Sequence, residues 1–278
     1  MFNRQPCGDM TKGLFVYVFV FGMLAIAAGQ GVSVSAERDA YAAAVHGKDA
    51  QSKAKALELF LKNYPNGELR EAAAESLVEV YRQIRSAKEL DALEELLQMN
   101  PNNLYGLTVK ASLQCDDEPR PGMCAEEEVE LVNRGLRVLA TASKPEYMAE
   151  AKFVTQKAEA VLVFHSLAGV EAIRRSDYKS AQQHLEAAVQ VNPASFACVY
   201  PLALVYLKAT PPDPVRGLFF LARAANLAEL PSYQKQIAQY GKTEYVKFHG
   251  SEQGWTELMK IAKTSTTLPA GFAITSPH

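Results

Sequence analysis

The stretch Phe164–Pro193, FHSLAGVEAIRRSDYKSAQQHLEAAVQVNP, decides how this chain folds, because it reads as two helices joined by a tight turn. Apolar residues recur at helical spacing on both sides of Ser176-Asp177. These two side chains compete for backbone groups and favour a turn over a helix interior. The second helix is expected to end at Pro193. Small residues stand where two antiparallel helices would touch, at Gly169, Ala181 and Ala188.

The same stretch resembles one unit of the tetratricopeptide repeat (TPR) family, a helix-turn-helix unit of about 34 residues. The matching positions are Gly169, Tyr178, Ala181, Leu185, Ala188 and Pro193. His165 stands where the family usually has Trp, so the first helix departs from the pattern. The resemblance implies an all-α fold, a right-handed α-solenoid of antiparallel helix pairs in which each pair contacts its neighbours.

Further helix pairs are expected on both sides of this stretch, which brings the chain to about twelve helices. Ser86 and Glu89 have the spacing of a capping box, Asp213-Pro214 predicts a sharp helix start, and Ser251 is expected to cap the last helix. The helical repeat domain is therefore expected to span 37–264.

Composition and charge are those of an ordinary globular protein. The chain has 278 residues, of which 48% are hydrophobic and 22% charged, and its formal net charge is −2. Because the balance is near neutral and no basic stripe appears, nucleic acid is not an expected partner. No alternating run of β-branched residues predicts a sheet.

The first 36 residues read as a signal peptide or a membrane anchor. Arg4 and Lys12 precede an uncharged run over 13–36, whose densest part, 14–28, is LFVYVFVFGMLAIAA. A positive start and an apolar core of this length are typical of a secretory signal, cleaved after Ala27 or Ala36. The alternative is retention, in which 13–36 tethers the chain to the inner membrane. Both predict an exported protein, in the periplasm or facing it.

A disulfide between Cys115 and Cys124 is expected if the body is exported, because these residues flank an eight-residue loop with two prolines and a glycine. Cys198 lies within a repeat helix and is expected to be a buried thiol. The acidic run Glu126–Glu128 follows the loop. It favours the start of a helix through the helix dipole, and a divalent-cation site is the alternative.

The tail 265–278 is expected to dock on the last helices through Leu268, Phe272 and Ile274, and disorder is the alternative. Trp255 is expected in the core at that end. The strings 245–255 and 268–272 also resemble the ending of exported bacterial proteins of this repeat class, which have no assigned activity.

No motif in the sequence predicts catalysis. Walker, dinucleotide-binding, zinc-protease and nucleophile-elbow patterns are all absent. No histidine has a second His or Cys at ligand spacing. His165 and His184 could approach each other across the hairpin, where a packed or solvated pair is expected. We therefore predict that the protein is not an enzyme, and we predict no cofactor and no metal site.

The TPR resemblance implies a groove lined by the first helix of each pair. The repeat register places five side chains toward it: Arg82, Ser166, Arg174, Tyr200 and Lys208. Arginines bind carboxylates through two parallel hydrogen bonds, so an extended peptide with an acidic group or a free C-terminus is the expected ligand. The family's carboxylate-binding Lys and Asn set is not found here. The alternative is that these side chains form a solvated surface.

The expected function is that of a non-catalytic TPR-like scaffold that binds a protein or peptide outside the cytoplasm. The alternative is a structural or assembly component of the cell envelope that acts through oligomerisation. A monomer that captures peptides would favour the scaffold, and a stable higher assembly would favour the structural role.

Overall fold

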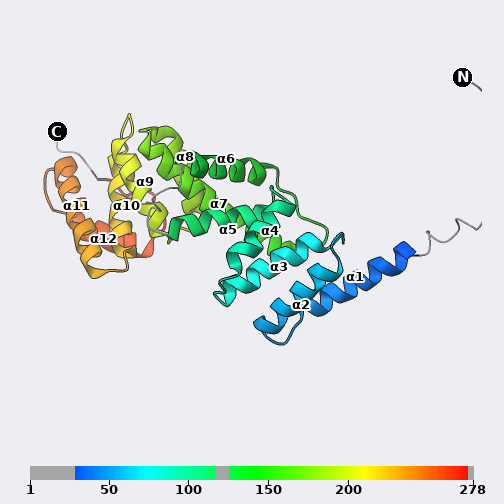
Figure 1. Ribbon diagram of the computed structural model, residues 1–278. Coiled ribbons are helices and arrows are strands. Elements are labelled where there is room, and N and C mark those ends of the chain that lie inside the picture. The colour runs from blue at the N-terminus through cyan, green and yellow to red at the C-terminus, as the bar shows by residue number, and fades with distance from the viewer. Residues whose placement is uncertain (1–28, 117–124, 275–278) are drawn as a thin grey trace, which may run out of the picture.

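The computed structural model describes residues 29–116 and 125–274, and this part of the chain is helical with no strand. Its twelve helices are labelled in Figure 1. They are α1 (Gly29–Val45), α2 (Ala50–Asn63), α3 (Arg70–Gln83), α4 (Glu89–Met99), α5 (Leu104–Asp116), α6 (Ala125–Thr141), α7 (Glu150–Arg174), α8 (Tyr178–Val191), α9 (Phe196–Lys208), α10 (Pro214–Leu227), α11 (Pro231–His249) and α12 (Trp255–Thr264). The predicted all-α class is confirmed.

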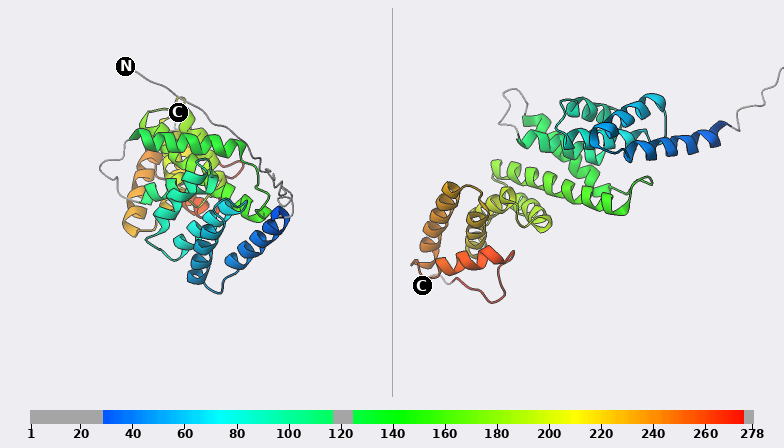
Figure 2. Two further views of the ribbon diagram at one scale, coloured as in Figure 1. Left: turned by 45° about the vertical axis from the view of Figure 1, so that its right-hand side comes forward. Right: turned by 90° about the horizontal axis from the view of Figure 1, so that it is seen from below.

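The helices pack in the order of the sequence. From α1 to α11 each helix contacts the next one, and α12 turns back to pack on α10. In the middle of the chain, alternate helices also touch, because α5 contacts α7 and α7 contacts α9. The molecule is elongated, with α1 at one end and α11 and α12 at the other (Figures 1 and 2).

The predicted central hairpin forms from α7 and α8, which share the most extensive helix–helix contact in the fold. Ala181, Leu185 and Ala188 are fully buried. A Cβ atom at Gly169 would lie 2.6 Å from Cγ of Leu185, so a larger residue there would force the helices apart. The small residues therefore let α7 and α8 approach closely, as predicted.

Two hairpin turns have the same backbone conformation. Arg85, between α3 and α4, has φ of 50°, and Ser176, between α7 and α8, has φ of 58°. The next residue in each turn donates its amide hydrogen to a carbonyl five residues earlier, Ser86 to Tyr81 and Asp177 to Ala172, both at 2.9 Å. This is the hydrogen-bond pattern with which helices end at a left-handed residue.

Helix starts follow the expected chemistry in three places. The carboxylates of Asp49, Asp177 and Asp213 accept hydrogen bonds from amides of the first turn of α2, α8 and α10. Pro214 occupies the first turn of α10, as predicted.

Two capping predictions are wrong. The Ser86 hydroxyl accepts from the amide of Lys88, and α4 begins without a side-chain cap, because Ser86 closes the preceding turn. The Ser251 hydroxyl lies 3.2 Å from Nδ1 of His249, and α12 begins later, after the left-handed Gly254.

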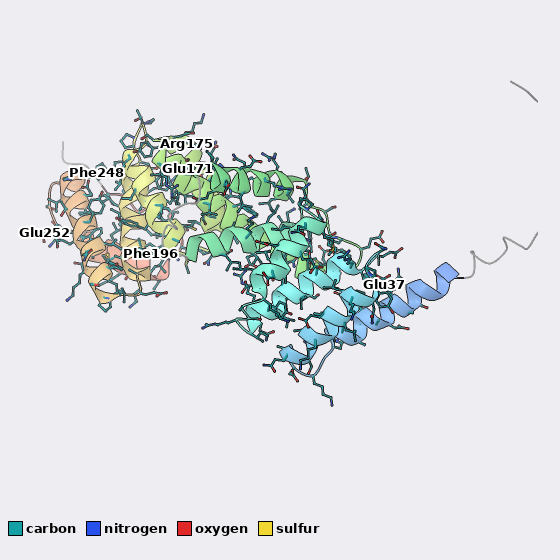
Figure 3. All side chains as sticks on the ribbon, viewed as in Figure 1. Glu37, Glu171, Arg175, Phe196, Phe248 and Glu252 are labelled. Carbon is teal, nitrogen blue, oxygen red and sulfur yellow. The ribbon has the colours of Figure 1, made fainter. Side chains whose placement is uncertain are left out.

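Helix α1 begins at Gly29, eight residues before the predicted start of the repeat domain at residue 37. The proposed boundary between residues 36 and 37 therefore falls inside a helix. Glu37 is anchored, since its carboxylate accepts the Leu69 amide at 2.7 Å before α3 (Figure 3). Among the described residues, no helix has both the length and the apolar character needed to cross a membrane. The apolar run 14–28 lies outside the described residues.

The described part of the tail packs on the last helices, as predicted. Ile274 is buried, and Leu268 and Phe272 are partly buried against a cluster that includes Phe219, Trp255 and Leu258. Within the last helix, Trp255, Leu258 and Ala262 form the buried face. The tail thus covers the apolar cluster at the C-terminal end of the fold.

Candidate functional site

Helix α7 carries two pockets along one of its faces. The first, of about 490 Å³, lies among α3, α5 and α7, and we call it the α3–α5–α7 pocket. The second, of about 320 Å³, lies mainly among α5, α7 and α9, and we call it the α5–α7–α9 pocket. Its one contribution from another helix is Glu128 of α6.

The α7 residues that line the two pockets recur every three or four positions, so they share one face of the helix. They include Lys152, Gln156, Glu159, Val163, Ser166, Val170 and Arg174. At 1.5 Å per residue this face extends roughly 33 Å. The two pockets are therefore successive parts of one surface.

The α3–α5–α7 pocket is polar. Nζ of Lys152 lies 2.8 Å from a carboxylate oxygen of Glu79, which joins α7 to α3 across the pocket. Burial, helped by the negative charge of Glu79, raises the pKa of Tyr105 well above its usual range, so this phenol stays protonated. Arg82 lines the same pocket, and within the described part of the chain no carboxylate lies at ion-pair distance from it.

The α5–α7–α9 pocket has an apolar floor, formed by Leu162, Val163, Leu167 and Val170. Its one basic side chain is already paired, because Nη1 of Arg174 lies 3.0 Å from a Glu171 carboxylate oxygen. The hydroxyl of Ser166 donates to the carbonyl of Leu162 and lies 2.9 Å from Sγ of Cys198. The pocket therefore offers apolar contact and few free polar groups.

The structure brings together only some of the five predicted groove residues. Ser166 and Arg174 line the α5–α7–α9 pocket and Arg82 lines the α3–α5–α7 pocket. Tyr200 and Lys208 are on α9 and line neither pocket. Tyr200 stacks on Phe196 with ring centroids 5.7 Å apart, and Lys208 is exposed in the last turn.

Sequence reasoning missed Glu79, Tyr105 and Lys152. These residues come from three helices, and nothing in their local sequence marks them. Only the packing of α7 against α5 brings Lys152 near Glu79 and Tyr105. Arg82 could be placed toward the groove from the repeat register alone, because that placement needs only the residue's position within one helix.

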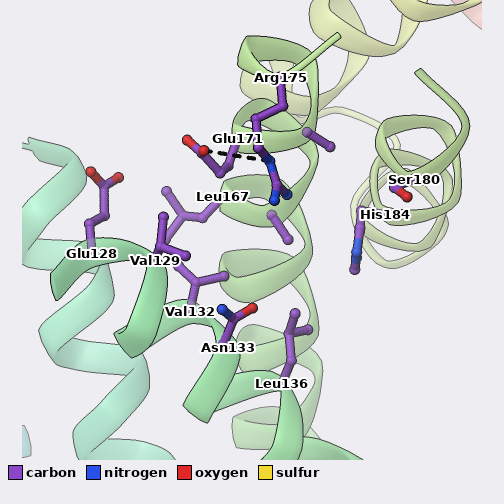
Figure 4. A pocket seen from close by; sticks show the side chains of 12 residues that line it. Glu128, Val129, Val132, Asn133, Leu136, Leu167, Glu171, Arg175, Ser180 and His184 are labelled. Carbon is purple, nitrogen blue, oxygen red and sulfur yellow. Dashed lines mark ion pairs between the residues drawn. The ribbon is translucent and has the colours of Figure 1, made fainter. Parts of the chain in front are cut away.

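A smaller pocket of about 150 Å³ lies among α6, α7 and α8 (Figure 4), and we call it the α6–α7–α8 pocket. Its charged side is the ion pair between Glu171 and Arg175, at 3.7 Å. His184 lines it from α8. Nδ1 of His184 is 3.2 Å from Nδ1 of His165, so the two histidines do approach each other across the hairpin. Burial lowers the pKa of both imidazoles.

Cys198 is a buried thiol, as predicted, with the hydroxyls of Ser166 and Ser195 beside it. The predicted disulfide falls outside the described residues, which exclude Cys124 and the side chain of Cys115. In the part of the chain that the structure describes, no group of three or more His, Cys, Asp or Glu side chains is arranged to hold a metal ion.

Two comparisons with known proteins were negative. No protein-family model matches the chain. A search of curated proteins also finds no match. The proposed function therefore rests on the residues and pockets described above.

Proposed function

We propose that this protein is a non-catalytic, TPR-like α-solenoid that binds an extended segment of a protein or peptide along the pocket-bearing face of α7. The observation that carries the proposal is that both pockets on this face are walled by α3, α5, α7 and α9, the first helices of successive pairs. In the TPR family these helices line the ligand groove.

A side-chain arrangement that occurs twice supports the repeat interpretation. Tyr81 of α3 donates to Glu58 of α2, and Lys88 lies over the tyrosine ring, 5.9 Å from its centroid. At the other end of the molecule, Tyr206 of α9 donates to Glu186 of α8, and Arg216 lies 5.7 Å from its ring centroid. In both places one helix pair is joined to the next by a Glu, a Tyr and a cation.

Two hairpin turns also support the repeat interpretation. The left-handed residues Arg85 and Ser176 follow the first helices of two pairs, with the same hydrogen bonds. The contacts of α5 with α7 and of α7 with α9 are those expected when first helices stack side by side. A solenoid needs roughly three or more such pairs to bury a continuous core.

The chemistry of the two pockets suggests what the bound segment carries. The apolar floor of the α5–α7–α9 pocket suits one or two apolar side chains. Arg82 suits a carboxylate, because no carboxylate of the described residues lies at ion-pair distance from it, while Arg174 is held by Glu171. The parts of α7 that line the two pockets are centred about 20 Å apart. An extended chain covers that distance with about six residues.

Affinity selection of random linear peptides on the full-length protein tests the proposal. We expect enrichment of peptides with an apolar residue and an acidic residue or C-terminus about six positions apart. Arg82→Glu and Val170→Asp should each weaken binding at least tenfold, and Lys208→Glu tests whether the site extends along α9. Lys260→Glu, on the exposed side of α12, is the matched control.

Two results would contradict the proposal. One is that no peptide is enriched. The other is that the enriched peptides bind the parent, Arg82→Glu and Val170→Asp equally well while circular dichroism shows unchanged helicity. A stable oligomer without peptide capture would instead favour a structural or assembly component of the cell envelope.

We also propose that the protein is exported, as a periplasmic protein or one tethered to the inner membrane through 13–36. The support is the positively charged start and the apolar run 14–28. The intact mass of the protein isolated from the native cell decides between cleavage and retention. Loss of residues up to Ala27 or Ala36 would show cleavage, and a full-length mass in the cytosolic fraction would contradict export.

A further inference from the structure

His165 and His184 face each other across the central hairpin, the first on α7 and the second on α8. Their Nδ1 atoms are 3.2 Å apart, and the ring centroids are 5.1 Å apart with an angle of 57° between the planes. Both residues are half-buried. The position of each ring is therefore set by the packing of two helices and does not depend on a loop.

We propose that the two Nδ1 atoms form a two-ligand site for an imidazole-binding divalent transition metal, such as Cu²⁺ or Zn²⁺. In a tetrahedral site with Zn–N bonds of 2.0–2.1 Å, two ligand nitrogens lie about 3.3 Å apart. The observed 3.2 Å is close to that separation. Imidazole suits Zn²⁺ and Cu²⁺, and affinity for Cu²⁺ is generally the highest of the divalent series.

The proton balance of binding is simple. In the hydrogen bond between the rings, one imidazole carries its hydrogen on Nδ1 and the other accepts it. When the metal binds, the donor ring loses the Nδ1 hydrogen and takes up one on Nε2. Both Nδ1 lone pairs then bind the metal, both rings stay neutral, and no net proton is released.

One of the two histidines faces a pocket, because His184 lines the α6–α7–α8 pocket together with Ser180 and Asn133. Because the protein supplies two ligands, water fills the remaining positions, and a small anion entering this pocket could replace it. A bound metal would tie α7 to α8 next to the close contact between Gly169 and Leu185. The site does not depend on the proposed peptide-binding function.

Titration of the full-length protein, purified without a histidine tag, with Cu²⁺ and Zn²⁺ tests the site. We expect one equivalent to bind, and His165→Asn and His184→Asn each to weaken binding at least tenfold. His249→Asn is the matched control, because His249 lies on α11 away from the pair and its removal should leave binding unchanged. Zn²⁺ should raise the melting temperature of the parent and of His249→Asn but not of the other two variants.

Electron paramagnetic resonance of the Cu²⁺-loaded parent provides a measurement that needs no variant. Two imidazole nitrogens in the copper's coordination plane are expected. One nitrogen or none, or equal affinity of the parent and His184→Asn, would overturn the proposal. If either variant fails to fold by circular dichroism, the nitrogen count in the parent decides alone.

Discussion

The guanidinium of Arg223 in α10 donates two hydrogen bonds to the carbonyl oxygen of Pro193, from Nε at 3.0 Å and from Nη2 at 2.7 Å. Its Nη1 also donates to the carbonyls of Ala262, at 3.3 Å, and Ser265, at 2.6 Å. These carbonyls lie at the C-terminal ends of α8 and α12, where helix dipoles favour a cation. Arg223 thus joins the ends of two helices from the interior, with only 6% of its surface exposed.

Replacing Arg223 should strongly destabilise the C-terminal half. Arg223→Ala removes the donor from the buried carbonyl of Ala262 and from the partly buried carbonyls of Pro193 and Ser265, and we expect a loss of about 2–4 kcal/mol in the free energy of unfolding. Urea denaturation followed by circular dichroism measures it. Arg137→Ala, which breaks an exposed ion pair with Glu130, is the control and should change stability by less than about 1 kcal/mol. Equal losses of unfolding free energy in the two variants would contradict the stabilising role of Arg223.

Removing the tail from Leu268 onward should lower the melting temperature by a few degrees, because about 1–2 kcal/mol of apolar packing is lost. The contacts at stake are those of Leu268, Phe272 and Ile274 with the cluster around Trp255. A truncation that removes only residues 275–278 serves as the control. Identical melting curves for the two truncations would show that the packed tail contributes nothing.

The repeated tyrosine contacts should be energetically equivalent. Tyr81→Phe and Tyr206→Phe each remove one hydrogen bond to a carboxylate, which contributes about 1.5–3 kcal/mol. Tyr233→Phe, at an exposed tyrosine, should be neutral. A double-mutant cycle of Tyr206→Phe with Glu186→Gln isolates the interaction, and a coupling energy near zero would rule it out.

Glycine at Ser176 should stabilise the central hairpin. A non-glycine residue with φ of 58° is strained by about 1 kcal/mol, and glycine adopts this conformation freely. We expect Ser176→Gly to raise the free energy of unfolding by about 0.5–1 kcal/mol, and Arg85→Gly to do the same in its hairpin. Ser180→Gly, inside α8, should destabilise instead. A loss of stability in both turn variants would contradict the shared turn conformation.

The buried carboxyl of Glu75 should make stability depend on pH. Burial raises its pKa above the usual value, although Asn103 donates to it at 2.7 Å. The folded state binds this proton more tightly than the unfolded state. The protonated Glu75 carboxyl therefore contributes its full stabilisation below the unfolded pKa of about 4.3. It is lost as the pH rises through the folded pKa.

Glu75→Gln mimics the protonated carboxyl and should remove that loss. We expect the variant to be more stable than the parent at pH 7, by about 1 kcal/mol, and equal to it near pH 4. Thermal melts across this pH range measure the difference. Glu94→Gln, at an exposed position on α4, is the control. A Glu75→Gln variant that is less stable than the parent at pH 7 would contradict the raised pKa of Glu75.

The helical class, the central hairpin and its small-residue contact could be predicted from the sequence, because helical periodicity and turn residues act over a few positions. Asp213 and Pro214 marked a helix start for the same reason. Ser86 and Ser251 are not caps, because the Ser86 hydroxyl accepts from the Lys88 amide and the Ser251 hydroxyl contacts His249.

Which charged side chains pair between helices depends on tertiary packing. Glu171 and Arg174 are three residues apart in one helix, whereas Arg82 lines a pocket among three helices in which no described carboxylate lies at ion-pair distance from it. Packing also brings Lys152 to Glu79 and Arg223 to Pro193, whose partners lie 73 and 30 residues apart in the sequence. Electrostatic and hydrogen-bond energies depend on distances of a few ångströms, and helix packing sets those distances.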